Sequence, residues 1–339
     1  MKNLLACLLL LYSFAIHAQT PFTFTLQHKS ETLSLRGLCV VSPQIVWASG
    51  TQGTVLRTLN AGKTWQKIAP QGYEKLDFRD IHAFDSLRAI VINAGSPAYV
   101  LCTQDGGKTW TKVYENTHKS AFLDDLAFAD NQNGLVFGDT DSTGKFLTLL
   151  TTDAGKTWKT NQNFFPTPQG GEAGFAASGS ILHYRKNKIW LATGGGKTSH
   201  VFYSTNAGKS WEIQQTPICA GKEAQGIFSL AIGRGNNWVG VGGDYTQADS
   251  HLKTCVYTAD AGKSWRESAQ PPRGYRSGVG YVAGKVFVCV GTSGSDFSAD
   301  NGNTWQALNN HNLNAIRFVQ GGKIGWAVGN NGQIFVVND

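Results

Sequence analysis

The octet TTDAGKTW, residues 151–158, recurs in five near-copies along the chain. All six octets obey the pattern Ser/Thr-x-Asp/Asn-x-Gly-x-Thr/Ser-Trp. Successive octet tryptophans lie 45, 48, 53, 54 and 40 residues apart. Repeats of this length are typical of the blades of a β-propeller, each of which is one four-stranded sheet. The octets are Thr58–Trp65, Thr103–Trp110, Thr151–Trp158, Ser204–Trp211, Thr258–Trp265 and Ser298–Trp305.

The octet suits a tight turn whose end is anchored in a core. Asp153 can accept hydrogen bonds from nearby amides, and Gly155 can take a positive φ at little steric cost. Trp158 is expected to return to the apolar interior and to bury roughly 150–250 Å², which corresponds to about 4–6 kcal/mol. We therefore assign a structural role to the octet side chains Asp105, Asp153, Asp260, Asp300, Trp65, Trp110, Trp158, Trp211, Trp265 and Trp305.

The composition favours a globular, all-β protein. Of its 339 residues 41% are hydrophobic and 16% are charged, so the chain can bury a large core. Forty glycines, ten tryptophans and nine prolines suggest many tight turns between strands anchored by aromatic residues. No long amphipathic helix pattern is evident.

The first repeat predicts four strands, named a to d in chain order, with the octet as the c–d turn. Strand a of the next five repeats is expected near Phe78, Leu126, Phe175, Phe228 and Val279. The four predicted strands of the first repeat are Arg36–Val41, Ile45–Ala48, Thr54–Thr58 and Thr64–Ile68.

Six octets indicate six blades, but the C-terminal segment contains a seventh unit that lacks strand d. Residues 22–27, FTFTLQ, alternate apolar with polar side chains, as a half-buried strand does. Pairing them with the last unit would close the ring and remove exposed sheet edges. The sequence therefore predicts one seven-bladed domain, residues 19–339. Its blades are 33–69, 76–116, 122–162, 172–215, 224–268, 273–308, and 312–339 with 21–29.

Residues 1–18 are typical of a signal peptide, with Lys2 before the short apolar run Leu4 to Ile16. We expect export to the periplasm or beyond the cell, with no stable membrane insertion. Five cysteines remain after the signal, an odd number, and a disulfide scaffold is not expected. They are Cys39, Cys102, Cys219, Cys255 and Cys289.

The net charge of +7 comes from basic residues spread along the chain. This spread favours a solvated turn face over a nucleic-acid groove. The histidines lack metal-ligand spacing, and no dinucleotide-binding or Gly-x-Ser-x-Gly motif is present. We therefore predict a monomer without metal or cofactor.

In a propeller the d–a and b–c connections share one face, opposite the octets. The b–c connections differ in length between blades, and the longest is Gly242–Lys253. Such unevenness is typical of a binding face. The predicted site residues on this face are Arg36, Arg79, Asp80, Asp124, Asp125, Glu172 and Arg276 near the strands a, and Asp139, Asp141, Asp244, Tyr245 and Asp296 in the b–c connections.

This mixed ring of arginines and carboxylates allows two interpretations. It can bind a polar or charged ligand through bidentate arginine contacts, or its charges can pair with one another across the axis. On the binding interpretation, Arg276→Ala or Glu172→Ala should abolish binding and leave the melting temperature nearly unchanged.

The octets resemble Asp boxes, also called bacterial neuraminidase repeats. The fuller pattern resembles the photosystem II stability/assembly factor family of seven-bladed propellers. It runs from Trp47–Gly50 through Val55–Thr58 into Gly62–Trp65 and is echoed by Gly325–Gly329. Gly171–Ser178, Gly242–Tyr245 and Gly274–Ser277 are similar to an exported bacterial branch of that family. The resemblance implies a chaperone-like binding scaffold, as in the photosynthetic members, which assist assembly of a membrane-protein subunit.

We therefore expect an exported, non-catalytic scaffold that binds a protein or a polar ligand such as a glycan. A sialidase-like glycan hydrolase remains an alternative, with Arg36, Arg79 and Arg276 as an arginine triad and channel carboxylates as acid and base or nucleophile. The Arg-Ile-Pro segment and the Tyr–Glu pair of sialidases are missing. A third alternative is an oxidoreductase, as relatives of this branch are often described, although no cofactor motif supports it.

Overall fold

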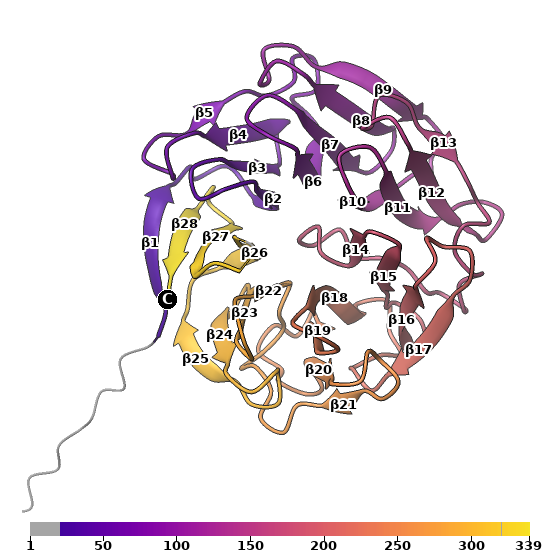
Figure 1. Ribbon diagram of the computed structural model, residues 1–339, viewed down its shortest axis with the longest axis vertical. Helices are drawn as coiled ribbons and strands as arrows, with labels where there is room; N and C mark the ends of the chain where they lie inside the picture. The colour runs from indigo at the N-terminus through magenta and orange to yellow at the C-terminus, as the bar shows by residue number, and fades with distance from the viewer. Residues whose placement is uncertain (1–20, 320) are drawn as a thin grey trace, which may run out of the picture.

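Seven four-stranded antiparallel sheets are arranged as a ring around a central channel in the computed structural model, which describes residues 21–319 and 321–339 (Figure 1). The predicted seven-bladed, all-β propeller is therefore confirmed. The predicted signal peptide, residues 1–18, lies outside the described residues.

Each blade runs outward from the channel in chain order, except the last. The first contains β2 (Leu35–Val40), β3 (Val46–Gly50), β4 (Thr54–Thr58) and β5 (Gln66–Lys67). The second contains β6 (Asp77–Ala83), β7 (Ala89–Ala94), β8 (Ala98–Thr103) and β9 (Thr111–Asn116). The third contains β10 (Leu123–Phe128), β11 (Gly134–Thr140), β12 (Phe146–Thr151) and β13 (Lys159–Thr160). The fourth contains β14 (Leu182–Arg185), β15 (Lys188–Ala192), β16 (Ser199–Ser204) and β17 (Glu212–Thr216).

The remaining blades complete the ring. The fifth contains β18 (Gln225–Ile232), β19 (Trp238–Asp244), β20 (Cys255–Thr258) and β21 (Arg266–Glu267). The sixth contains β22 (Gly278–Tyr281), β23 (Phe287–Gly291), β24 (Gly294–Ser298) and β25 (Gln306–Asn309). The seventh contains β26 (Leu313–Phe318), β27 (Ile324–Gly329), β28 (Ile334–Asn338) and β1 (Thr23–His28).

The N-terminal strand closes the ring, as the alternation of residues 22–27 predicts. β1 pairs antiparallel with β28, with Thr23 opposite Asn338 and Leu26 opposite Phe335. Phe24 packs edge-on against Phe335, and Phe22 is buried in the core of this blade. The two ends of the described chain therefore stabilise one sheet together.

The octets form the c–d turns through the same hydrogen bonds in all six copies. The hydroxyl of the first residue accepts the amide of the fifth at 2.9–3.0 Å. Oδ1 of the third residue accepts the amide of the seventh at 2.9–3.0 Å. Two consecutive residues take positive φ, for example Ala154 (64°) and Gly155 (78°). The sequence analysis predicted a positive φ only for the glycine, because alanine seldom takes this conformation.

The octet tryptophans all pack against the apolar clusters of the blades, but to different depths. Trp305 is 2% exposed, whereas the other five are partly exposed. The indole nitrogen of Trp110 donates to the carbonyl of Ile68 (2.9 Å), which holds the ring at the edge of the preceding blade. The deep anchors are instead the tryptophans of the strands b, Trp47, Trp190, Trp238 and Trp326.

Strand a of the fourth blade is not near Phe175, as the sequence predicted, but is β14 (Leu182–Arg185). The apolar residues before it have the composition of a strand, but they leave the blade and enter the channel. We name residues 173–180 the plug segment.

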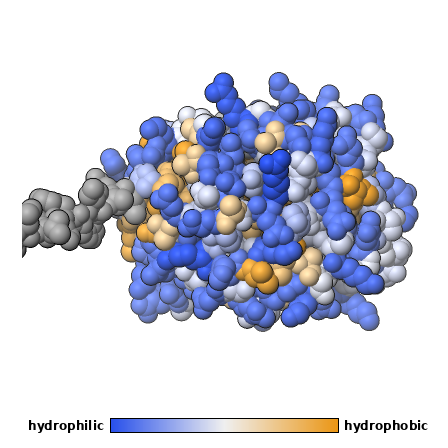
Figure 2. Space-filling view, turned by 90° about the horizontal axis from the view of Figure 1, so that it is seen from below, coloured by the Kyte–Doolittle hydropathy of each residue, from blue (hydrophilic) through white to orange (hydrophobic). Residues whose placement is uncertain are grey.

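Hydrophilic residues dominate the outer edge of the ring that Figure 2 shows, and apolar residues there form small separate groups. None of the described residues forms a helix of the length and apolarity that a membrane crossing needs.

Candidate functional site

A cavity of about 480 Å³ opens at the mouth of the channel, on the face of the b–c and d–a connections. Arg36, Arg79 and Asp124 enter it from the strands a of the first three blades. Asp139 enters it from the end of β11 and not from a b–c connection, where the sequence analysis placed it, and Tyr245 enters it from the b–c connection after β19. The plug segment forms its floor through residues 173–177.

The plug segment is held by arginines from the far side of the ring. Arg317 of β26 donates from Nη2 to the carbonyls of Ser178, at 2.8 Å, and Gly179. Arg36 and Arg79 each donate from Nη1 to a carbonyl of the plug segment, Ala177 and Ala176 respectively, over the longer distances of 3.4 and 3.5 Å. The longer distances mean that Arg317 is the firmer anchor.

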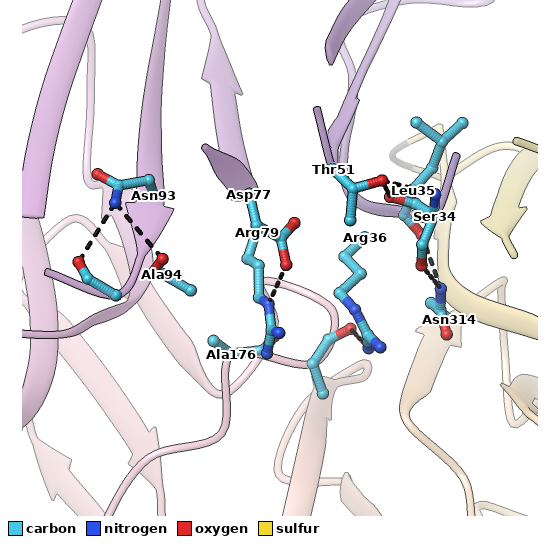
Figure 3. Close-up of polar contacts among 12 residues, drawn as sticks. Ser34, Leu35, Arg36, Thr51, Asp77, Arg79, Asn93, Ala94, Ala176 and Asn314 are labelled. Atoms are coloured by element: carbon cyan, nitrogen blue, oxygen red, sulfur yellow. Dashed lines mark hydrogen bonds and ion pairs between the residues drawn. The ribbon is translucent and has the colours of Figure 1, made fainter. Parts of the chain in front are cut away.

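Arg36 and Arg79 form a cationic wall. Figure 3 shows their side chains pointing from neighbouring blades toward the plug segment. Arg79 donates from Nε to Asp77 at 2.8 Å, whereas Arg36 has no carboxylate partner among the described residues. Burial, followed by the nearby charge of Arg79, lowers the pKa of Arg36. An anion placed between the two guanidinium groups would relieve this repulsion.

Asp124 and Asp139 form an acidic wall in the same cavity. Asp124 is 1% exposed, and within the described residues neither of its carboxylate oxygens has a hydrogen-bond partner. Burial and the charge of Asp139 raise its pKa well above the usual value. Burial also raises the pKa of Asp139 to about 6. Asp139 therefore holds its proton at pH 5, where carboxyl groups are normally ionised, and releases it above about pH 6, whereas Asp124 is held in the protonated form above its usual pKa.

The third wall is aromatic. Phe175 of the plug segment stacks on Phe228 with ring centroids 3.7 Å apart. Tyr275 packs edge-on against Phe228 at 4.9 Å, and Tyr245, which is 53% exposed, lies at 6.0 Å. Burial raises the pKa of Tyr275, so its hydroxyl remains protonated. Apart from Tyr245, the sequence analysis missed these side chains as site residues, although Gly174-Phe175 and Gly274-Tyr275 lie in stretches that carry the family resemblance.

Five of the predicted site residues thus line the cavity: Arg36, Arg79, Asp124, Asp139 and Tyr245. Arg276 and Asp296 do not. Arg276 is fully buried and donates to Oδ2 of Asp296 from Nε (2.7 Å) and Nη2, while Arg273 binds the other carboxylate oxygen at 3.0 Å. This pair is placed to stabilise the sixth blade.

Asp80 and Asp125 connect neighbouring blades. Asp80 accepts the amide of Leu126 at 2.8 Å, and Asp125 accepts the amides of Ile181 and Leu182 at 2.7 and 3.0 Å. Each carboxyl group therefore binds the backbone of the following blade. Burial raises the pKa of both.

Glu172 and Asp244 also make internal hydrogen bonds. Glu172 is buried, binds Nδ1 of His200 at 2.9 Å, and accepts the hydroxyl of Thr193. Asp244 accepts hydrogen bonds from Gln225 and Thr246. Asp141 lies in an exposed connection and binds Thr143. All three thus hold their own connections in place.

Metal and disulfide sites are not evident in the described part of the chain. No group of three or more His, Cys, Asp or Glu residues there is placed to hold a metal ion. Cys39, Cys102, Cys219, Cys255 and Cys289 are all free thiols.

The fold and the site together define a class of protein: a seven-bladed β-propeller with a plugged channel and a charged cavity at its mouth. No protein-family model matches the chain, and no curated protein matches it. Solved structures do share its fold, and the photosystem II assembly factor YCF48 is among them.

YCF48 bound to D1 peptide is 14% identical, with a TM-score of 0.67 over 95% of this chain and 98% of that one. YCF48 from Cyanidioschyzon merolae is 16% identical, with a TM-score of 0.65 over 94% and 99%. The GH74 xyloglucanase from Xanthomonas campestris is 15% identical, with a TM-score of 0.61 over 92% of this chain and 53% of its own. At such identities the likeness confirms the fold that the resemblance implies.

Proposed function

We propose that this chain is a non-catalytic binding scaffold whose channel mouth recognises a carboxylate-bearing segment of a protein partner. The observation that carries the proposal is Arg36, a partly buried guanidinium beside Arg79 with no carboxylate partner among the described residues. Partial burial of a cation without a counter-ion costs free energy, and an incoming carboxylate would offset that cost. The protonated Tyr275 hydroxyl and the exposed Tyr245 would add contacts at the rim.

Two further considerations support this function. One structure of the same fold is YCF48 bound to D1 peptide, so a propeller of this shape can hold a peptide. The signal-like residues 1–18 favour a partner outside the cytoplasm, and we propose that the chain acts there as a monomer.

The blocked tripeptide acetyl-Ala-Glu-Ala-amide tests the proposal. Arg36→Ala should weaken its binding by about tenfold or more, since a charge-assisted hydrogen bond is lost. Isothermal titration would measure the dissociation constant. Arg266→Ala, which removes an exposed arginine from β21, is the matched control and should bind as the wild type does. Equal binding by Arg36→Ala and the wild type would refute this assignment.

A glycan hydrolase is the second candidate, and Asp124 with Asp139 is the observation that favours it. Two carboxyl groups in one open cavity, one with a pKa of about 6, can supply a general acid and a base or nucleophile. The GH74 xyloglucanase shares the fold. On this alternative the purified protein releases reducing ends from a panel of oligosaccharides at pH 6, and Asp124→Asn abolishes the release. Absence of turnover across the panel would exclude it. Nothing in the described residues favours the oxidoreductase alternative.

A further inference from the structure

A second cavity of about 600 Å³ lies directly beside the first. The two cavities share Phe122, Asp139 and Ala173 as lining residues, so they meet along one wall. The second cavity extends outward between connections of the second, third and fourth blades, from Ser96 to Gly170. We name the first cavity the inner subsite and the second the outer subsite.

Side chains of both charge signs line the path from the inner to the outer subsite. Arg36 and Arg79 line the inner end, Asp139 lies where the cavities meet, and Lys119 lines the outer cavity. Three further carboxyl groups line these cavities: Asp124, which is buried, Glu223 at the inner subsite, and Glu172, which is buried against His200 and Thr193 at the outer one. Neither Arg36, Asp139 nor Lys119 takes part in an ion pair within the described residues. Within residues 21–319 and 321–339, the one hydrogen bond to the Asp139 side chain comes from the amide of Gly174, at 3.2 Å. These charges are therefore available to a ligand.

The outer subsite is open where its wall consists of glycine. A Cβ added to Gly170 would meet no atom within 4 Å, and Gly170 is exposed without a positive φ. A large side chain can therefore be introduced at residue 170 without backbone strain, and it would occupy the outer subsite.

We propose that the two cavities are subsites of one groove that binds an extended polypeptide segment, with an acidic side chain between Arg36 and Arg79, a cationic side chain at Asp139, and a second acidic side chain near Lys119. The proposal rests on the proposed function of the inner subsite and extends it. A polypeptide fits because it carries charges of both signs along one chain, whereas acidic glycans carry mainly negative charge. In an extended segment alternate side chains point to the same face, so charges at every second residue can follow the groove.

The probe is the blocked pentapeptide acetyl-Glu-Ala-Lys-Ala-Glu-amide, whose charge order is the same in both chain directions. Its charge-inverted control is acetyl-Lys-Ala-Glu-Ala-Lys-amide. We expect the first to bind at least about tenfold more tightly, since like charges placed together oppose binding. Isothermal titration would measure both dissociation constants, and equal affinities would overturn the assigned charge order.

The variant Gly170→Trp tests the proposed groove separately from the inner subsite. It should weaken binding of the pentapeptide by about tenfold and leave the tripeptide acetyl-Ala-Glu-Ala-amide unaffected, because only the longer ligand reaches the outer subsite. Lys209→Trp, which adds the same side chain on an octet, is the control and should change neither affinity. Circular dichroism would verify that both variants are folded.

The other outcomes are decisive in different ways. Unchanged pentapeptide binding by folded Gly170→Trp would overturn the groove and leave the inner subsite standing. Failure of the wild type to bind even the tripeptide would instead overturn the proposed function. Binding of an oligogalacturonate that Gly170→Trp blocks, without binding of the pentapeptide, would assign the groove to a glycan.

Discussion

Replacing Arg276 by alanine is expected to lower the free energy of unfolding by about 3–5 kcal/mol, as the loss of one partner from a buried ion pair does. Arg276 is 0% exposed, and its removal leaves the Asp296 carboxylate, 1% exposed, with only Arg273 as a counter-charge. Urea unfolding followed by tryptophan fluorescence would measure the change. This expectation replaces the sequence-based one, in which Arg276→Ala left the melting temperature nearly unchanged.

Arg273→Ala is the control for this experiment. Arg273 binds the same carboxylate at 3.0 Å, but its side chain is 42% exposed, so its loss should cost no more than about 1 kcal/mol. The double variant Arg276→Ala/Asp296→Ala should recover part of the loss, because no buried carboxylate is left and the unpaired Arg273 is 42% exposed. A wild-type unfolding midpoint for Arg276→Ala would show that the pair does not stabilise the sixth blade.

Asp125→Ala is expected to cost about 2–5 kcal/mol, because it leaves the buried amides of Ile181 and Leu182 without an acceptor. These two residues follow the plug segment directly, so the fourth blade should loosen first. Hydrogen exchange at the two amides would report that loosening. Asp125→Asn keeps a carbonyl acceptor and should lose far less stability than Asp125→Ala at pH 5.

The same residue gives the stability of the protein a defined dependence on pH. Burial and the neighbouring charge of Asp80 raise the pKa of Asp125 well above the ordinary value, so the folded state keeps a proton that the unfolded state releases above about pH 4. The contribution of protonated Asp125 to the free energy of unfolding is therefore fully present below about pH 4 and is lost as the pH rises through the raised pKa. Asp125→Asn cannot ionise, and its free energy of unfolding should fall less between pH 5 and 9 than that of the wild type. Parallel slopes for the two proteins would contradict this assignment.

The octet aspartates give the free energy of unfolding the opposite pH dependence, and they do so in a lower pH range. Hydrogen bonds from the side chain and amide of Thr109 lower the pKa of Asp105 to about 2. The stabilisation from such a carboxylate is present above pH 4 and is lost as the pH falls toward 2. Asp105 therefore does not titrate in the pH window from 5 to 9 in which Asp125→Asn is compared with the wild type, so it does not contribute to that comparison.

Of the seven charged residues predicted near the starts of the strands a, Arg36, Arg79 and Asp124 line the cavity, and the other four make internal hydrogen bonds or ion pairs. The sequence could not separate these two roles. Arg36 and Arg276 have the same chemistry and comparable positions in their repeats. Arg276 has Asp296 within reach on β24, the third strand of its own blade, whereas among the described residues Arg36 has only the carbonyl of Ala177, 141 residues away in the chain. The different roles of the two arginines depend on which group the fold places opposite each guanidinium, and the residues next to each arginine in the sequence do not encode that.

The amino-acid sequence by itself determined six of the seven blades through the octet, because the octet is a local device. Its side chains bind amides within four residues, so the turn forms in the same way in every blade that carries an octet, regardless of the residues around it. The alternation of residues 22–27 similarly predicted that β1 would pair with the last sheet. Only the tertiary structure decided that the segment around Phe175 leaves its blade to plug the channel. Arginines from the first, second and seventh blades bind its carbonyls there, and these partners come together only after the ring has closed.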